Sequence, residues 1–235
     1  MKPNPQILNG ILAGLSRDAY ARLTPHLQHV NLPVGMLLTE PNGTLRYAYF
    51  VNSGMVSVVA ALANGNSLEV GVIGREGMAD VSILLGCETS LNRIIVQVTG
   101  TGMRMKAATL NRLYNDSNSS LRASGNRYIQ YRLNQVSQSA ICNHAHQIEE
   151  RLARWLLSTA DAVGEDRFDL THEFLSQMLG ARRSSVTLVA GVLAESGMIE
   201  YRRGRIKILK RPQLQELACE CYGLLKAEAS HLSRN

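Results

Sequence analysis

The chain of 235 residues has few aromatic residues, few cysteines and no long apolar run. Its longest apolar stretches, such as residues 55–63, are far shorter than the ~20 residues that a membrane-spanning helix needs. The N-terminal MKPNPQ also lacks the charged and apolar regions of a secretory signal. We therefore expect a soluble, cytoplasmic protein with no membrane partner.

The four cysteines, Cys87, Cys142, Cys219 and Cys221, form no C-x-x-C pair and are too few for a disulfide scaffold. Catalytic patterns are missing as well. The six histidines show no triad-like or metal-hydrolase spacing, and the chain has no P-loop and no paired-carboxylate motif. These absences argue against an enzyme.

What the chain does contain is a helix-turn-helix pattern in residues 170–209. Thr171 is a suitable N-cap for a first helix, and Gly180 suits a tight turn with positive φ after it. A second helix, roughly Arg182–Glu195, would pack on the first through Val186 and Val189. This order of elements is typical of DNA-binding domains.

A basic hairpin is expected after the second helix. Gly197 would end that helix, and Met198–Arg202 and Arg205–Leu209 alternate apolar and polar residues around Arg203-Gly204. Residues 182–211 contain eight Arg or Lys and only two Glu. This surplus of six positive charges equals the formal net charge of the whole chain, +6. The positive charge is therefore concentrated on one module, as binding to phosphates requires.

Two groups of residues are predicted to contact duplex DNA. The first turns of the second helix would present side chains to the base edges, namely Arg182, Arg183, Ser184, Ser185 and Thr187. The first helix and the hairpin would hold the phosphates through Thr171, Arg202, Arg203, Arg205 and Lys207.

The front half of the chain is predicted to be a β-roll or barrel. Twelve of the nineteen glycines lie before residue 115. Seven of them recur about every ten residues, as tight turns between short antiparallel strands would require: Gly35, Gly43, Gly54, Gly65, Gly74, Gly86 and Gly100. The expected strands are Tyr47–Val51, Met55–Ala60, Ser67–Val72 and Arg93–Val98. Short helices over Pro5–Gly14 and Ser16–Leu27 would precede them.

A helical period runs from about Ser119 to Ala162. Its apolar residues recur at steps of three or four, including Leu121, Leu133 and Val136. We expect this stripe to form the seam of a homodimer, with packing against the chain's own β-roll as the alternative. The predicted parts are therefore a sensor domain over 1–118, a dimerisation helix over 119–147 and a DNA-binding domain over 148–235.

The order of these parts resembles the Crp/Fnr superfamily of bacterial transcription regulators. The resemblance is carried by ERLARWLL at 150–157, by LTHEFLSQMLGARRSSVT at 170–187 and more loosely by YFVNSGMVSVV and GVIGREGM in the β-roll. It implies an α+β fold with an N-terminal cyclic-nucleotide-binding-like, jelly-roll-like β-roll, a long dimerisation helix and a C-terminal winged helix-turn-helix. It also implies a palindromic operator in double-stranded DNA and RNA polymerase as a further partner.

The family's cyclic-nucleotide residues are only partly matched. The stretch around Glu76 does not align cleanly with the Gly-Glu pair that holds a ribose, and Arg93 is followed by Ile94 where a hydroxyl would hold the phosphate. On the helix, the positions expected at the base are Val136 and Ser137. Glu76, Arg93 and Ser137 remain the candidate effector residues, and cyclic nucleotide remains an open alternative with no cofactor assigned.

The N-terminal region lacks the cysteine cluster that iron–sulfur sensing in this family requires. One unusual motif is left, Cys142-Asn143-His144-Ala145-His146, where Cys142 and His146 share a helical face. Two copies across a dimer would bring two sulfurs and two nitrogens together, whereas polar hinge residues usually cap helices or bond to backbone. No metal is assigned on this basis.

Two functions from different classes follow from the sequence. The favoured function is a homodimeric transcription regulator whose β-roll senses an effector. The alternative is a small-molecule-binding module, with cyclic nucleotide among its candidate ligands, that acts through protein contacts. Salt-sensitive binding to duplex DNA would separate the two.

Overall fold

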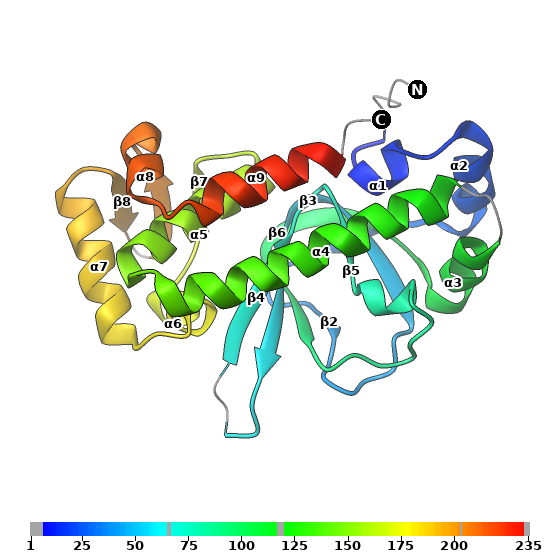
Figure 1. Ribbon diagram of the computed structural model, residues 1–235, viewed down its shortest axis with the longest axis horizontal. Helices are drawn as coiled ribbons and strands as arrows, with labels where there is room; N and C mark the ends of the chain where they lie inside the picture. The colour runs from blue at the N-terminus through cyan, green and yellow to red at the C-terminus, as the bar shows by residue number, and fades with distance from the viewer. Residues whose placement is uncertain (1–6, 65–66, 117–119, 203, 233–235) are drawn as a thin grey trace.

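The computed structural model describes residues 7–64, 67–116, 120–202 and 204–232. A β-roll and a small helical domain lie side by side, and one long helix, α4 (Ser120–Ala145), runs along both (Figure 1). The expected fold class, an α+β protein with β-roll, long helix and helix-turn-helix, is confirmed. No helix among the described residues is long and apolar enough to cross a membrane.

Three short helical segments open the chain: α1 (Gly10–Ala13), α2 (Arg17–Leu23) and the 3-10 helix η1 (Thr24–His26). Asn9 and Ser16 cap α1 and α2 with their side chains, as short polar side chains at such positions do. The buried Asn9 amide also donates to the carbonyls of Val51 and Gly77, at 2.8 and 2.7 Å. The N-terminal helices are thus joined to the β-roll.

The β-roll is an antiparallel sheet in which β1-β6-β3-β4 are neighbours, while β2 pairs with β6 and β5 with β3. Its strands are β1 (Gln28–Leu32), β2 (Leu37–Thr39), β3 (Tyr47–Ala61), β4 (Ser67–Ile73), β5 (Met78–Ala79) and β6 (Arg93–Lys106). A 3-10 helix, η2 (Val81–Ile83), lies between β5 and β6, and α3 (Ala107–Asn115) follows β6.

Two glycines were wrongly interpreted as turns. Gly54 lies inside β3 and Gly100 inside β6, so the two expected strands of residues 47–60 form one long strand. A Cβ on Gly100 would lie 1.9 Å from the Ser53 carbonyl oxygen, and one on Gly54 would lie 2.5 Å from the Val98 oxygen. The glycines allow the two backbones to approach where their register shifts.

The predicted helical stretch of residues 119–162 is two helices rather than one. α4 ends at Ala145, and α5 (Ile148–Val163) begins after Gln147, whose backbone N–H donates to Glu150 Oε2 at 2.9 Å. This capping box satisfies the first turn of α5 and fixes the break between the helices. One face of α4, including Tyr128 and Arg132, is buried, while Leu133 and Val136 are exposed.

The C-terminal domain has a helix-turn-helix beside a three-stranded sheet of order β7-β9-β8. Its elements are β7 (Arg167–Asp169), α6 (His172–Leu179), α7 (Arg183–Glu195), β8 (Ile199–Arg202), β9 (Arg205–Ile208) and α8 (Arg211–Leu217). The sequence predicts the hairpin β8–β9 but not β7, which is only three residues long.

The last helix, α9 (Cys221–Leu232), leaves this domain and runs along α4 toward the N-terminal helices (Figure 1). Asn134 Nδ2 of α4 donates to Glu228 Oε2 of α9 at 3.1 Å. Near its end, Ala229 and Leu232 pack against the apolar core formed by α1–α4 and the β-roll. α9 therefore connects the two halves of the molecule.

A second core joins the C-terminal domain to the β-roll. Met55 and Val59 of β3 lie in the same buried cluster as Leu152, Leu156 and the apolar residues of α6 and α7. Between the two parts, the buried Glu69 of β4 accepts a hydrogen bond from Trp155 Nε1 of α5 at 2.8 Å. The helix-turn-helix is thus held in one orientation on the β-roll.

Candidate nucleic-acid interface and effector cavity

The two helices of the helix-turn-helix form for local reasons. Thr171 accepts a hydrogen bond from the Phe174 backbone N–H at 3.2 Å and so caps α6. Gly180 ends α6 with φ +56°, a left-handed conformation that favours glycine. Val186 and Val189 of α7 are buried against α6, as their spacing predicted.

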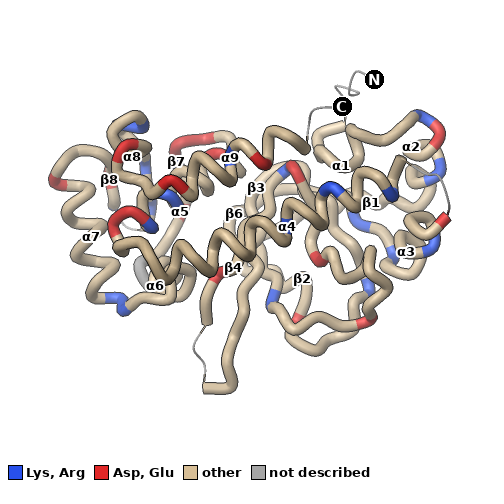
Figure 2. The backbone as a smooth tube through the Cα atoms, viewed as in Figure 1, with Lys and Arg blue, Asp and Glu red and all other residues tan. Residues whose placement is uncertain are grey.

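α7 presents a polar face to solvent at its N-terminal end. Arg182, Arg183, Ser184 and Thr187 are exposed, while Ser185 is half-buried beside the packing face. Figure 2 shows basic residues at the turn between α6 and α7. The structure therefore brings the predicted base-reading residues onto one end of one helix.

The hairpin β8–β9, which is the wing of this domain, places further cations on one side of the three-stranded sheet. Arg202, Arg205 and Lys207 line this surface together with Glu200 and with Arg167. Arg205 Nε lies 3.1 Å from Asp169 Oδ1, and both side chains are largely exposed. Arg167 was missed because a strand of three residues has no periodic pattern, and Arg203 lies outside the described residues.

Two cations of the basic stretch have partners within the domain. Arg211 pairs with Asp161 and with Asp166, and Lys210 Nζ donates to the Ser196 carbonyl oxygen at 3.1 Å at the end of α7. These two residues stabilise the domain internally. The sequence count of eight cations therefore overstates the positive surface that the structure offers.

The DNA-binding geometry has a counterpart among known proteins. A family model described as the Crp-like helix-turn-helix domain matches residues 150–217. Residues 150–217 are a Crp-like helix-turn-helix domain, and the chain shares the fold of Crp/Fnr regulators over most of its length. No curated protein matches the chain.

Several solved structures share this fold at low identity. A Crp/Fnr family transcriptional regulator from Eubacterium rectale matches with a TM-score of 0.70 at 18% identity, over 86% of this chain and 94% of its own. A Crp/Fnr regulator from Thermus thermophilus gives 0.65 at 22% identity, over 81% and 98%. The c-di-GMP-responsive global regulator CLP of Xanthomonas campestris gives 0.64 at 16%, over 82% and 99%. These proteins are regulators rather than enzymes.

The three candidate effector residues of this Crp/Fnr-fold protein do not converge. Glu76 lines an internal cavity, and its Oε1 accepts the Gly74 backbone N–H at 2.8 Å. Arg93 lies at the exposed start of β6, with its Nε 3.8 Å from Glu40 Oε2. Ser137 is exposed on α4 and does not line the cavity.

Aromatic and amide side chains of α4 fill the space beside the stretch 74–80. A Cβ on Gly77 would lie 2.2 Å from Tyr128 Oη, and this hydroxyl donates to the Met78 carbonyl oxygen at 3.0 Å. Gly71 is covered in the same way by Arg132 and Gln135, which both donate to the Val72 carbonyl oxygen at 3.1 Å. α4 therefore packs directly on β4 and on the loop after it.

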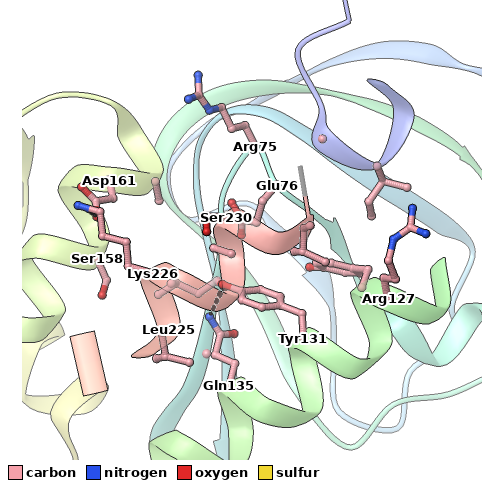
Figure 3. A pocket seen from close by; sticks show the side chains of 18 of the residues that line it. Arg75, Glu76, Arg127, Tyr131, Gln135, Ser158, Asp161, Leu225, Lys226 and Ser230 are labelled. Atoms are coloured by element: carbon pink, nitrogen blue, oxygen red, sulfur yellow. Dashed lines mark hydrogen bonds and ion pairs between the residues drawn. The ribbon is translucent and has the colours of Figure 1, made fainter. Parts of the chain in front are cut away.

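A cavity of about 470 Å³ is left between the β4–β5 loop, α4, α5 and α9. Residues of all four segments line it, among them Glu76, Tyr131, Gln135, Asp161 and Lys226, while the exposed Arg75 side chain extends away from the others (Figure 3). Six residues on one face of α4 line it, whereas the predicted Ser137 does not: Ser124, Arg127, Tyr128, Tyr131, Gln135 and Ser139. The lining mixes cations, carboxylates and apolar atoms.

Two buried carboxyl groups belong to this cavity. Burial raises the pKa of Glu69 to about 7, although hydrogen bonds from Ser57 and Trp155 oppose this shift. Burial also raises the pKa of Glu76, against hydrogen bonds from the backbone of Gly74 and of Glu76 itself. The cavity wall therefore changes charge near neutral pH at Glu69.

Proposed function

We propose that this protein is a homodimeric transcription regulator that binds duplex DNA. The observation that carries the proposal is α7, which buries Val186 and Val189 in the domain and exposes Arg182, Arg183 and Thr187 next to a basic wing. In a helix-turn-helix domain, this end of the second helix is the part that enters the major groove.

The reading residues on α7 differ from the Arg-Glu-x-x-x-Arg set that the family resemblance implies. Here the corresponding positions are Arg183, Ser184 and Leu188. Arg183 would donate to guanine O6 and N7, and Ser184 offers a shorter, less selective hydrogen bond. Leu188, which is 70% exposed, has the apolar surface that contacts a thymine methyl group. The preferred operator should therefore differ from the family's usual one.

The dimer is proposed to form through the exposed face of α4. Leu133, Val136 and Ala140 lie on that face, and residues 133–148 contain no Lys, Arg, Asp or Glu (Figure 2). Apolar side chains at such spacing in a helical stretch without charged residues are typical of a helix–helix seam. Two subunits joined there would place their α7 helices on successive major grooves ~34 Å apart.

The cavity between the β-roll, α4, α5 and α9 is the proposed effector site. A ligand there would contact three elements that together set the position of the C-terminal domain. The related CLP protein is described as responsive to c-di-GMP, so the fold accepts effectors other than cyclic mononucleotides. RNA polymerase remains a proposed partner of the DNA-bound form.

Selection from a pool of duplexes with a randomised core tests the proposed function. We expect the full-length protein to enrich a palindromic sequence whose half-sites are one helical turn, ~10 bp, apart. The affinity for the enriched duplex should fall steeply with salt, by ~0.9 log units per log unit of salt for each phosphate contacted. No enrichment, together with a flat salt response, would support the alternative of a small-molecule module acting through protein contacts.

A further inference from the structure

Three cysteines and one histidine meet at the point where the chain enters and leaves the C-terminal domain. Cys142 lies in the last turn of α4 and His146 directly after it, whereas Cys219 lies between α8 and α9, and Cys221 begins α9. One ligand atom from each of these four residues lies within 4.8 Å of all the others. The three sulfurs form a small buried cluster of their own, and the side chain of His146 is only 15% exposed.

We propose that Cys142, His146, Cys219 and Cys221 bind one zinc ion per chain. The Sγ atoms of Cys142 and Cys219 are 3.6 Å apart, and Cys221 Sγ is 3.7 Å from His146 Nδ1. A tetrahedral zinc with bonds of about 2.3 Å to sulfur and about 2.0 Å to nitrogen would separate two sulfurs by about 3.8 Å and sulfur from nitrogen by about 3.5 Å. The ligand atoms are therefore already near their bound spacing.

Neighbouring polar groups are arranged as they are around metal ligands. His146 Nε2 lies 3.1 Å from Glu220 Oε2, which directs the Nδ1 atom toward the sulfurs. Gln138 Nε2 donates to Cys221 Sγ at 3.0 Å, as amides do to metal-bound thiolates. A carboxylate holding the second nitrogen of a histidine is a recurrent feature of zinc sites.

The charge of such a site is compensated by α5. Three thiolates, a neutral imidazole and Zn²⁺ carry one net negative charge, and Arg151 and Arg154 lie on the facing helix. Arg151 Nη2 donates to Asn143 Oδ1 at 2.7 Å, next to Cys142.

The geometry favours a single zinc ion over the other groups that cysteines hold. Iron–sulfur clusters need their cysteine sulfurs farther apart than 4.8 Å, because several iron and sulfide atoms lie between them. A Cys142–Cys219 disulfide would leave Cys221 and His146 unused. The dimer-bridging pair of Cys142 and His146 that the sequence suggested is replaced by a complete set within one chain.

Zinc at this place would fasten the C-terminal domain at its base. Two of its ligands precede the helix-turn-helix in the sequence and two follow it. The ion would therefore hold α9 against the end of α4 independently of the other contacts in the domain. Because a preformed site adds its binding free energy to folding, removing the ion should loosen α9 first.

Metal analysis of the full-length protein, purified without a polyhistidine tag and without added DNA, tests this proposal. We expect one zinc ion per chain in the wild type, loss of most of it in Cys221→Ser, and no loss in Cys87→Ser, which replaces the exposed cysteine outside the cluster. After chelation, Co²⁺ should restore thiolate-to-metal charge-transfer absorption and tetrahedral d–d bands.

A milder variant covers the case in which Cys221→Ser does not fold. Glu220→Gln changes an exposed carboxylate and should weaken zinc affinity by about 10–100-fold, measured by competition with a chromophoric chelator. Glu216→Gln on α8 is the matched control and should bind like the wild type. The proposal would be overturned if the wild type took up neither zinc nor cobalt. It would also be overturned if the protein contained iron with acid-labile sulfide in place of zinc, or a disulfide between Cys142 and Cys219.

Discussion

At the scale of single residues, the proposed DNA-binding surface consists of side chains with different expected roles. Arg183 lies on the exposed start of α7, while Lys207 lies on the wing. A residue that reads a base affects sequence preference, whereas one that holds a phosphate affects all sequences alike. Substitutions of these two residues should therefore differ in kind.

Arg183→Ala is expected to cost roughly 1–3 kcal/mol on the preferred duplex and to relax the preference at one base position. Lys207→Ala should weaken binding equally on all duplexes and lower the salt slope by ~0.9. Fluorescence anisotropy with singly substituted duplexes at several salt concentrations measures both effects. Arg17→Ala removes the same charge from the distant α2 and should change neither. Equal behaviour of the two test variants would contradict the assignment.

Cyclic AMP should bind weakly or not at all. Arg93 lies apart from Glu76, Ile94 offers no hydroxyl, and Tyr128 fills the space beside Gly77. Each missing hydrogen-bond partner leaves about 1–3 kcal/mol of phosphate desolvation uncompensated, so two would turn a micromolar site into one of roughly millimolar affinity. Calorimetric titration measures this directly. A low-micromolar dissociation constant that Arg93→Ala abolishes would restore the cyclic-nucleotide interpretation.

At the scale of elements, α4 has three different surfaces. One side packs on β4 through Tyr128, Arg132 and Gln135, and a second side contacts α9. The third side carries Leu133 and Val136, which the described part of the chain leaves exposed. Burying a leucine side chain contributes about 1.5–3 kcal/mol to the free energy of association. In a twofold symmetric dimer, each such leucine is buried once in each subunit.

Leu133→Glu should therefore convert dimers into monomers, because two buried carboxylates would face each other across the seam. The variant should lose affinity for the operator while it keeps weak, non-specific binding to DNA. Sedimentation velocity at micromolar concentration measures the oligomeric state. Leu91→Glu, at an 80% exposed leucine of the β-roll, is the control and should stay dimeric. A monomeric wild type would refute the proposed seam.

At the scale of the whole molecule, Glu69 joins the β-roll to the C-terminal domain. Its carboxyl group accepts hydrogen bonds from Ser57 of β3 and from Trp155 of α5, at 2.5 and 2.8 Å. Because burial raises its pKa from the usual 4.5 to about 7, the folded protein keeps a proton that the unfolded chain releases.

The free energy of unfolding should consequently fall as the pH rises from 4.5 to 7, by about 3 kcal/mol in total from this group, and level off above pH 7. Glu69→Gln keeps the shape and removes the titration, so its stability relative to the wild type should increase over the same pH range. Urea unfolding at a series of pH values provides the comparison. Parallel stability curves for the two proteins would show that Glu69 does not titrate in this window.

Much of the C-terminal domain could be predicted from the sequence, because its signals are local. Thr171 caps a helix whose first N–H groups lie within three residues of it, and Gly180 adopts the positive φ that its own missing side chain allows. The periodicity that buries Val186 and Val189 likewise extends over only a few residues. Such features depend little on the rest of the fold.

The sequence by itself determined the helix-turn-helix and the basic wing, since each rests on spacing within one element. The apolar stripe predicted for residues 119–162 is divided by the tertiary structure, which buries Leu121 in the chain's own core and leaves Leu133 and Val136 exposed. Only the tertiary structure decided that Gly100 serves strand approach instead of a turn, that Arg211 pairs internally, and that Gln135 rather than Ser137 lines the cavity. It also brought Cys219 and Cys221 to Cys142, because α9 returns along α4 after the C-terminal domain. Contacts between residues so far apart in sequence depend on the path of the whole chain, which no local pattern encodes.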